Sequence, residues 1–322
     1  MTSPLLKTPL SGTTATVRVP GTSANLGPGF DSLGLAVSLY DTLAISTLVG
    51  PELEFELSGE GVAELPRDAS HLVVKTLDIA WARLGYSRGG VRVTANNVLP
   101  HGRGLGSSAS AIVAAIMAAN ALVAPEDRQD AAWVLQLASE LEGHPDNVAP
   151  AIFGAVAISW QDGADYSSAK LTPSNMVVPV VAIPDVELKT ERARGMLPAT
   201  VPHADAAANS GRAALLIHAL SNDPSLLLAG TRDYLHQDYR SEAMPASAAL
   251  VAQLRQAGHA AFISGAGPTV MVLANGGAEA DAIVATITDL GETAQKTTSD
   301  GVSWRVLRLE VDLEGAKVEV HP

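Results

Sequence analysis

Cysteine is absent from this chain of 322 residues, and aromatic residues make up only 4% of it. Without cysteine there is no disulfide framework, no thiolate nucleophile and no cysteine-based metal site. With so few aromatic rings, the core must be built from alanine, valine, leucine and isoleucine. These absences predict a folded interior made of small aliphatic side chains.

Positive charge is also scarce, with 21 lysines and arginines against 34 aspartates and glutamates and a net charge of −13. That balance argues against a nucleic-acid partner, because nucleic-acid phosphates require a basic surface. It also means that local positive groups, rather than the overall field of the protein, must attract any anionic substrate.

Long apolar runs are missing as well. No unbroken apolar run reaches the roughly 18 residues that would suggest a membrane-spanning helix, and residues 1–12 lack the apolar region of a signal peptide. Hydrophobic residues make up 47% of the chain and charged residues 17%, which is typical of a folded protein. The length suffices for two domains. Together with the lack of long apolar runs, it leads us to expect a two-domain cytoplasmic enzyme without a membrane partner.

The most distinctive stretch is PHGRGLGSSAS at residues 100–110, which precedes an alanine-rich run. Glycines at positions 102, 104 and 106 disfavour a regular helix or strand, and apolar residues at helical spacing follow. The pattern predicts a loop that opens a helix near Ser107 or Ser108, where free amides and the helix dipole attract phosphate. It is not a Walker A loop, which requires a lysine. A tight serine-capped turn without a ligand is the alternative.

The string GLGSSA at residues 104–109 resembles the second motif of the GHMP kinases. Further strings, in order along the chain, resemble the homoserine kinase family of that superfamily: PGTSANLGPGFDSLG (20–34), EGHPDNVAP (142–150), TERARGMLP (190–198) and HQDYR (236–240). GAGPT (265–269) resembles the third motif of the superfamily. The resemblance implies an α+β, two-domain GHMP kinase fold. Its N-terminal domain (1–165) would be like domain 2 of ribosomal protein S5, and its C-terminal domain (166–322) would be ferredoxin-like.

The same resemblance implies a reaction, two cofactors and an acceptor. ATP would donate its γ-phosphoryl group to the side-chain hydroxyl of L-homoserine, giving O-phospho-L-homoserine for threonine biosynthesis. Mg²⁺ would be held by Ser108 and Glu142, with Glu140 as the second choice of carboxylate, because Mg²⁺ prefers oxygen ligands. The residues implied to hold the ATP phosphates are Pro100, His101, Gly102, Arg103, Gly104, Leu105, Gly106, Ser107, Ser108, Ala109 and Ser110.

On the acceptor side, the resemblance assigns the substrate carboxylate to Arg194 and Arg240, whose planar guanidinium groups suit it. It places Asn25, Asp31, His144 and Asn147 around the ammonium and the hydroxyl. Gly267 would let the backbone come close to the phosphate site. The catalytic candidates are Asp31, His144 and Asn147. Several superfamily kinases have an aspartate base at the place of Asn147, and asparagine cannot accept a proton at neutral pH. The identity of the base therefore stays open.

Two other functions remain as alternatives. A GHMP kinase for a mevalonate-like or sugar substrate would share the glycine loop but would not need the paired arginine strings. A non-catalytic nucleotide or amino-acid sensor would lose Ser108 or the acidic metal ligand, and this chain has both. A homodimer is also left open.

The pattern along the chain predicts several elements whose outcome is informative. We expect a helix at 71–84 capped by Ala69–Ser70, helices at 128–142, 210–219 and 245–256, and a strand at 152–160. The polar stretch 161–174 is the predicted domain boundary. Strands at 303–311 and 317–320 are expected to close one sheet.

Overall fold

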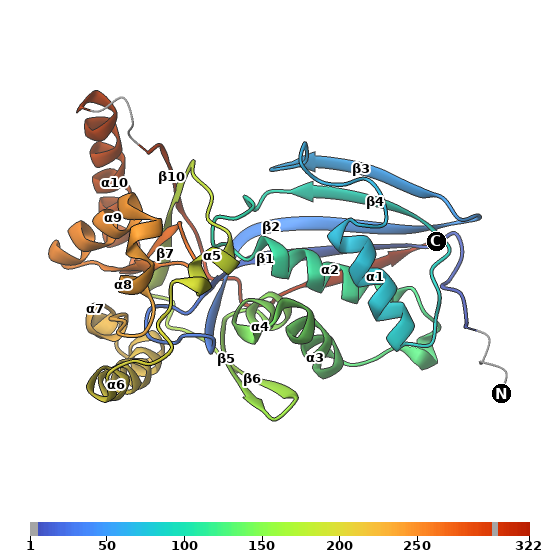
Figure 1. The fold of residues 1–322 in the computed structure, drawn as a ribbon, viewed down its shortest axis with the longest axis horizontal. Coiled ribbons are helices and arrows are strands. Elements are labelled where there is room, and N and C mark those ends of the chain that lie inside the picture. Colours follow the sequence, from blue (N-terminus) through green and yellow to red (C-terminus); the bar gives the residue numbers. More distant parts are fainter. Residues whose placement is uncertain (1–5, 298–301) are drawn as a thin grey trace.

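The computed structural model describes residues 6–297 and 302–322, and it confirms the α+β class. In the described part of the chain, one seven-stranded sheet and one four-stranded sheet lie at opposite ends of the molecule (Figure 1). Helices cover both sheets, and the loops that carry the predicted motifs lie between them.

The larger sheet is mostly antiparallel and has the order β11-β1-β2-β4-β3, with the hairpin β5–β6 attached to β2. Strands β3 and β4 form its parallel pair. Its bounds are β1 (Thr14–Ala24), β2 (Leu33–Leu48), β3 (Leu53–Gly59), β4 (Gly90–Asn97), β5 (Val156–Asp162), β6 (Asp165–Leu171) and β11 (Lys317–His321). Alternation along β1 buries Ala15, Val17 and Val19, as expected for a strand with one face on the core.

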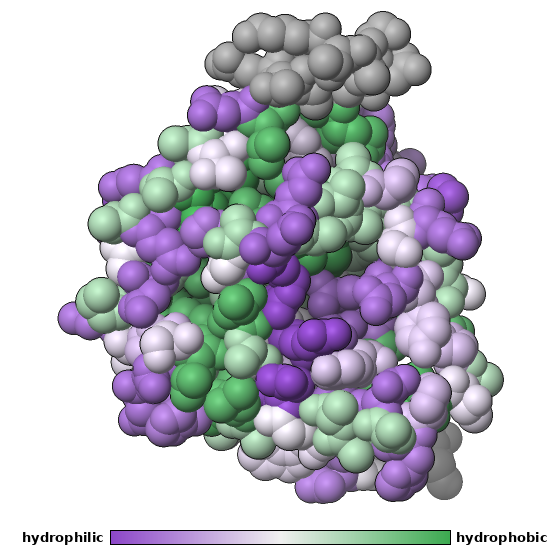
Figure 2. All heavy atoms as spheres, turned by 90° about the vertical axis from the view of Figure 1, so that its left-hand side faces the viewer, coloured by the Kyte–Doolittle hydropathy of each residue, from purple (hydrophilic) through white to green (hydrophobic). Residues whose placement is uncertain are grey.

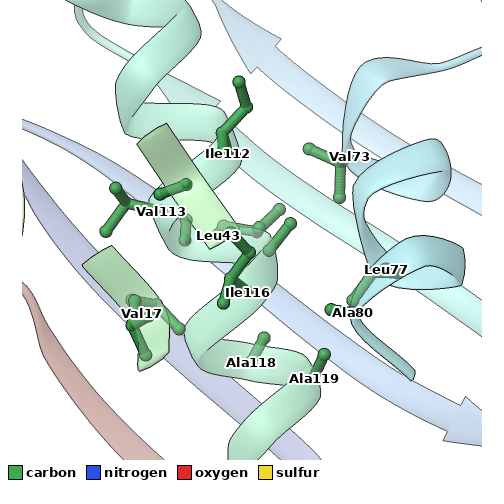
Figure 3. Packing of buried hydrophobic residues seen from close by; sticks show 14 of the residues in the cluster. Val17, Leu43, Val73, Leu77, Ala80, Ile112, Val113, Ile116, Ala118 and Ala119 are labelled. Carbon is green, nitrogen blue, oxygen red and sulfur yellow. The ribbon is translucent and has the colours of Figure 1, made fainter. Parts of the chain in front are cut away.

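Four helices pack on this sheet: α1 (Leu72–Arg83), α2 (Ser107–Ala121), α3 (Ala131–Glu142) and α4 (Pro145–Phe153). Helix α2 is central, because it contacts β1, β2, α1, α3 and α4. Figure 3 shows Ile112 and Ile116 of α2 packed with Val73 of α1 and with residues of the sheet. Helix α2 is apolar on nearly every side, which is the pattern of a fully buried helix. Its alanines let the neighbouring elements approach closely.

The smaller sheet is antiparallel and has the order β10-β7-β9-β8. Its strands are β7 (Val177–Pro184), β8 (Ala260–Ile263), β9 (Val270–Asn275) and β10 (Trp304–Arg308). The remaining helices are α5 (Thr190–Gly195), α6 (His203–Ser221), α7 (Leu227–Gly230), α8 (Gln237–Arg240), α9 (Pro245–Gln256) and α10 (Gly277–Thr297). Single 3₁₀ turns lie at Pro125–Asp127, Pro224–Leu226 and Ser241–Ala243.

Helix α4 corrects the strand predicted at 152–160, because the chain is helical through Phe153 and β5 begins at Val156. Pro150 inside this helix cannot donate to the carbonyl of Asp146. That carbonyl instead lies against Gly34, where a Cβ atom would overlap it. The absence of a side chain at Gly34 therefore leaves space for this helix. The local sequence argues against the helix because Pro150 lies inside it.

Three smaller predictions also change. The cap of α1 is His71, whose Nδ1 accepts the amide of Val73 at 3.2 Å, rather than Ala69–Ser70. Helix α6 begins at His203, earlier than the predicted residue 210. The two C-terminal strands join different sheets, since β10 pairs with β7 while β11 returns to pair with β1. The boundary predicted after residue 165 lies at the start of β6, just past the turn of the β5–β6 hairpin, and it stays a prediction.

Candidate active site

A polar cavity of about 100 Å³ lies where several loops of the two halves of the chain meet. We call it the polar cavity. It is lined by Ala24, Asn25, Gly102, Gly104, Gly106, Ser107, Ser108, Glu142, His144, Asp146, Asn147, Leu188, Thr190, Arg194, Arg240, Gly265 and Ala266. Tertiary structure thus brings together all of the strings that the sequence analysis singled out.

The predicted glycine loop and helix start are confirmed. Gly102, Gly104 and Gly106 have positive φ angles of 62°, 78° and 71°, and α2 begins at Ser107. A Cβ at Gly104 would overlap the carbonyl of Ser264, whose hydroxyl donates to the Gly104 carbonyl at 2.6 Å. No side chain caps the start of α2, so its free amides remain available for an anion.

Other residues of the predicted phosphate loop do not line the polar cavity. The Arg103 side chain turns outward, where it donates to the carbonyls of Pro184 and Asp185 and pairs with Glu187 at 3.0 Å. Leu105 and Ala109 are buried in the core. Pro100 lines a separate surface cavity beside Arg103, and His101 and Ser110 line a second, larger cavity described below.

Ser108 and Glu142 form the pair that could hold a metal. The Ser108 hydroxyl donates to Glu142 Oε2 at 2.8 Å, and burial raises the pKa of Glu142. A carboxylate withdrawn from water favours a cation nearby, and Mg²⁺ in kinases is usually held by one or two carboxylates together with substrate phosphates and water. No group of three or more acidic or histidine side chains that could hold a metal occurs within 6–297 and 302–322. The residues present fit the Mg²⁺ of a nucleotide complex.

Glu140 lies elsewhere. Its carboxylate accepts from Arg83 Nη2 at 2.9 Å and from Gln136 Nε2 at 2.8 Å, and it does not line the polar cavity. Side chains two positions apart on a helix point about 200° apart around its axis. Glu140 and Glu142 therefore point to different sides of α3. The geometry favours Glu142 as the ligand.

His144 and Asp146 form a short contact at the start of α4. His144 Nδ1 and Asp146 Oδ1 are 2.6 Å apart, and Asp146 is only 1% exposed. Burial alone would lower the pKa of His144, but the hydrogen bond and charge of Asp146, with the charge of Glu142, raise it. The sequence analysis gave Asp146 no role. The available signal was its place two residues after His144 at a proline-initiated helix.

Asn147 and Asn25 hold loops in place. Asn147 Oδ1 accepts from the Thr22 hydroxyl at 2.9 Å beside the start of α2. Asn25 donates to the Gly265 carbonyl at 2.9 Å and accepts from the Asp31 amide at 3.1 Å, so both ends of its amide are used. Gly267 does not line the cavity and packs behind Gly104, while Gly265 and Ala266 of the same turn face the cavity.

Two arginines enter the cavity in different states. Arg194 makes a two-pronged ion pair with Asp31, at 2.6 and 3.1 Å, and the hydrogen bond to Asp31 raises the pKa of Arg194. Arg240 is 2% exposed and donates to the carbonyls of Ala193 and Gly265 at 3.3 and 3.4 Å. Within the described residues no carboxylate lies within 4 Å of its guanidinium, and burial lowers its pKa. An unpaired buried cation is a receptor for an anion.

An apolar cavity of about 230 Å³ adjoins the polar one and shares Ser107 and Ser108 with it. It lies between α1, α2 and the strands β2, β3 and β4. Several polar groups line it, among them His71, whose Nε2 is buried with no partner among the described residues, Ser110, and Asp41, which accepts the amides of Val98 and Leu99. Sequence reasoning missed this cavity because its lining comes from five separate elements.

Comparison with known proteins agrees with this geometry. Family models for the GHMP kinase N-terminal domain and the GHMP kinase C-terminal domain match residues 71–155 and 211–293. The chain is 48% identical to the homoserine kinase of Streptomyces coelicolor, over 94% of this chain and 93% of that one. It is 45% identical to the homoserine kinase of Clavibacter michiganensis, over 96% and 95%. The crystal structure of homoserine kinase from Cytophaga hutchinsonii superposes with a TM-score of 0.83 at 26% identity, covering 95% of this chain and 97% of that one.

These matches decide the class. The chain is a kinase that belongs to the GHMP kinases, and within them to the homoserine kinase family. The resemblance read from the motifs and the two-domain fold are thereby confirmed. In the part of the chain that the structure describes, no helix is long and apolar enough to cross a membrane.

Proposed function

We propose that this chain phosphorylates the side-chain hydroxyl of L-homoserine with ATP, giving O-phospho-L-homoserine for threonine biosynthesis. The observation that carries the proposal is the meeting of two unlike cavities at Ser107 and Ser108. The apolar cavity suits a nucleoside, and the polar cavity, with its unpaired Arg240, suits a small zwitterion. The free amides at the start of α2 lie between them.

ATP would lie across both cavities. Its base and sugar would occupy the apolar cavity, and its phosphates would lie over the glycine loop at the positive end of α2. Ser108 and Glu142 would hold Mg²⁺, which when bound neutralises charge on the phosphates. Phosphoryl transfer depends mainly on positioning and charge stabilisation, and the loop and the helix start supply both.

The acceptor would bind beside Arg194 and Arg240. Its carboxylate would give Arg240 the anionic partner that it lacks among the described residues. Its ammonium would pair with Asp31, which now pairs with Arg194. In this arrangement the substrate replaces the Arg194–Asp31 ion pair with two ion pairs of its own. Asn25 holds the loop that carries Asp31.

The residues near the hydroxyl differ in what they can do with a proton. Asn147 cannot accept one. His144 has a raised pKa beside Asp146, which favours its protonated form. That form stabilises negative charge on the transferring phosphoryl group rather than accepting the proton. Asp31, as a carboxylate, can accept it. We therefore assign His144 an electrostatic role. Asp31 remains the candidate for accepting the hydroxyl proton.

The test of the acceptor site is Arg240→Ala. Truncating one member of a buried charge pair costs about 2–5 kcal/mol, so kcat/KM for homoserine should fall by roughly 30-fold to several thousand-fold. The Kd for ATP, measured by calorimetry, should barely change, and Arg240→Lys should rescue only part of the loss. Arg88→Ala, which removes a surface partner of Asp78, is the control. An equal loss of ATP affinity in Arg240→Ala would show that this residue binds the ATP phosphates instead of the substrate carboxylate.

A second experiment separates the substrates. ADP release should be measured with homoserine, mevalonate and galactose at equal concentrations. Release with homoserine alone supports the proposal, and release with mevalonate or galactose supports a different GHMP kinase. A sensor would release no ADP with any of them. Arg194→Ala, at a half-buried position, repeats the test if Arg240→Ala fails to fold.

A further inference from the structure

Three arginines line one broad surface cavity in the C-terminal half of the molecule. Arg212 of α6, Arg232 after α7 and Arg255 of α9 surround a hollow of about 590 Å³ together with Ser225, Gln256 and apolar side chains. We call these three residues the arginine cluster. No carboxylate is among the described residues that line this hollow. Figure 2 shows strongly hydrophilic side chains gathered near the middle of this end of the molecule.

The charge of the cluster has no partner in the described chain. None of the three guanidinium groups has a carboxylate oxygen within 4 Å among residues 6–297 and 302–322, whereas Arg88, Arg92 and Arg305 each pair with one. Burial, together with the positive charges of Arg232 and Arg212, lowers the pKa of Arg255. Three like charges gathered at one place repel one another, which is unfavourable unless an anion joins them.

The cluster is also held in place. Arg255 donates to the carbonyls of Leu228 and Ala261 at 2.7 and 2.9 Å and to the Thr231 hydroxyl at 3.0 Å. Arg212 makes one bond, to the Ala229 carbonyl at 3.3 Å, and Arg232 lies over the Tyr234 ring. Among the described residues, most donors of Arg212 and all of those of Arg232 have no hydrogen-bond acceptor. A preorganised guanidinium loses little freedom when an anion binds.

Asp233 and Asp238 line a neighbouring cavity together with Arg232 and Arg255, but in the described chain neither carboxylate lies within 4 Å of a guanidinium of the cluster. Asp233 lies next to Arg232 in sequence, but its carboxylate accepts the backbone amides of Leu235, His236 and Gln237 at 2.7–3.0 Å. The cluster shares no lining residue with either the polar or the apolar cavity. It is therefore separate from the site proposed above for ATP and homoserine.

We propose that the arginine cluster binds a small anion that carries a phosphoryl group. A phosphoryl group presents three oxygens and close to two negative charges at neutral pH, and several guanidinium forks can bind it at once. Free phosphate and a phosphorylated small molecule share this chemistry.

The test is calorimetry of inorganic phosphate binding to the full chain, with the active site filled by a non-hydrolysable ATP analogue and Mg²⁺. The wild type should show one saturable site per chain. Arg212→Ala/Arg232→Ala should weaken that site at least about tenfold, since hydrogen bonds to charged groups are lost. Arg92→Ala/Arg305→Ala removes the same charge from other surfaces and should change the Kd by less than about twofold.

Thermal unfolding checks that the variants fold, and Arg232→Ala alone repeats the test, because the contact of Arg232 with the described chain is with the Tyr234 ring. Glycerol 3-phosphate in place of phosphate distinguishes the two sources: tighter binding indicates a phosphorylated small molecule, and weaker binding indicates free phosphate. Non-saturable binding in the wild type, or equal losses in both double variants, overturns the proposal, because either result shows diffuse attraction without a site.

Discussion

Charge withdrawn from water is concentrated on a few side chains around the polar cavity. Glu142 and His144 have raised pKa values, and Arg240 has a lowered one. Burying an ion costs free energy unless it is paired. Asp146 pairs with His144, whereas Glu142 and Arg240 lack an oppositely charged ion-pair partner in the described chain. The proposed partners of these two side chains are a metal ion for Glu142 and the substrate carboxylate for Arg240.

If Ser108 and Glu142 hold Mg²⁺ as proposed, Ser108→Ala removes an oxygen ligand and Glu142→Gln removes the negative charge of another, so each should lower kcat by about 100-fold or more. The KM for homoserine should change little. The measurement is steady-state kinetics over a range of Mg²⁺ concentrations.

Glu140→Gln is the matched control, since Glu140 pairs with Arg83 at the surface. Surface ion pairs contribute about 0–1 kcal/mol, so kcat should stay within about twofold of the wild type. A greater loss in Glu140→Gln than in Glu142→Gln would show that the wrong carboxylate was chosen.

Asp146→Asn should lower the pKa of His144, measured by NMR titration of its ring protons. In the wild type, Asp146 raises the folded-state pKa of His144 above its unfolded value of about 6.5. The pair therefore stabilises the fold fully below that pH, and the contribution is lost as pH rises through the folded pKa. In Asp146→Asn this pH-dependent loss should disappear from urea unfolding curves. An unchanged His144 pKa would mean that Asp146 does not control it. Asp127→Asn, at a distant position, is the control.

At the scale of single elements, local pattern explains some features and not others. Helix α9 spans the predicted Pro245–Gln256, since proline at its first position and apolar spacing both act locally. The glycine loop and the start of α2 are also local, since positive φ angles need glycine. Helix α4 was missed because it contains Pro150 and packs closely against Gly34, which is more than 100 positions away in the chain and leaves space for the Asp146 carbonyl.

Gly104→Ala tests the packing of the loop. The new methyl group would overlap the Ser264 carbonyl at a φ of 78°, so it should destabilise the fold and weaken ATP binding. Left-handed strain costs about 1–2 kcal/mol, and overpacking adds about 1–3 kcal/mol. Gly85→Ala is the matched control, since Gly85 has a φ of 81° and open space around it. Equal losses of stability in the two variants would mean that backbone strain alone explains the effect. Overlap with the Ser264 carbonyl would then contribute nothing.

At the scale of the whole molecule, the chain crosses between its two halves more than once. Strand β10 lies in the smaller sheet, and β11 returns to the edge of the larger one. Tyr40 of β2 donates to Asp312 at 2.8 Å on this return path. The C-terminal segment therefore ties the two halves together around the polar cavity.

Removing residues 316–322 should lower the free energy of unfolding by about 2 kcal/mol or more, because β1 would lose the hydrogen bonds of five paired residues. Urea unfolding followed by circular dichroism measures this, and removal of Pro322 alone is the control. Coincident curves for the wild type and the longer truncation would show that β11 adds nothing to the sheet.

The sequence by itself determined the features that depend on neighbouring residues, namely the glycine loop and the helix that follows it. Its ordered motifs also identified the family, and that resemblance implied the α+β class. Glycine at alternating positions and serine at a helix start act over a few residues, so their spacing is enough. Only the tertiary structure decided which glutamate faces Ser108, that Arg194 pairs with Asp31 while Arg240 lacks a carboxylate partner in the described chain, and that an apolar cavity adjoins the loop. These depend on contacts between residues more than 30 positions apart in the chain, such as 34 for Ser108 and Glu142 and 163 for Arg194 and Asp31. Spacing along the chain carries no information about such contacts.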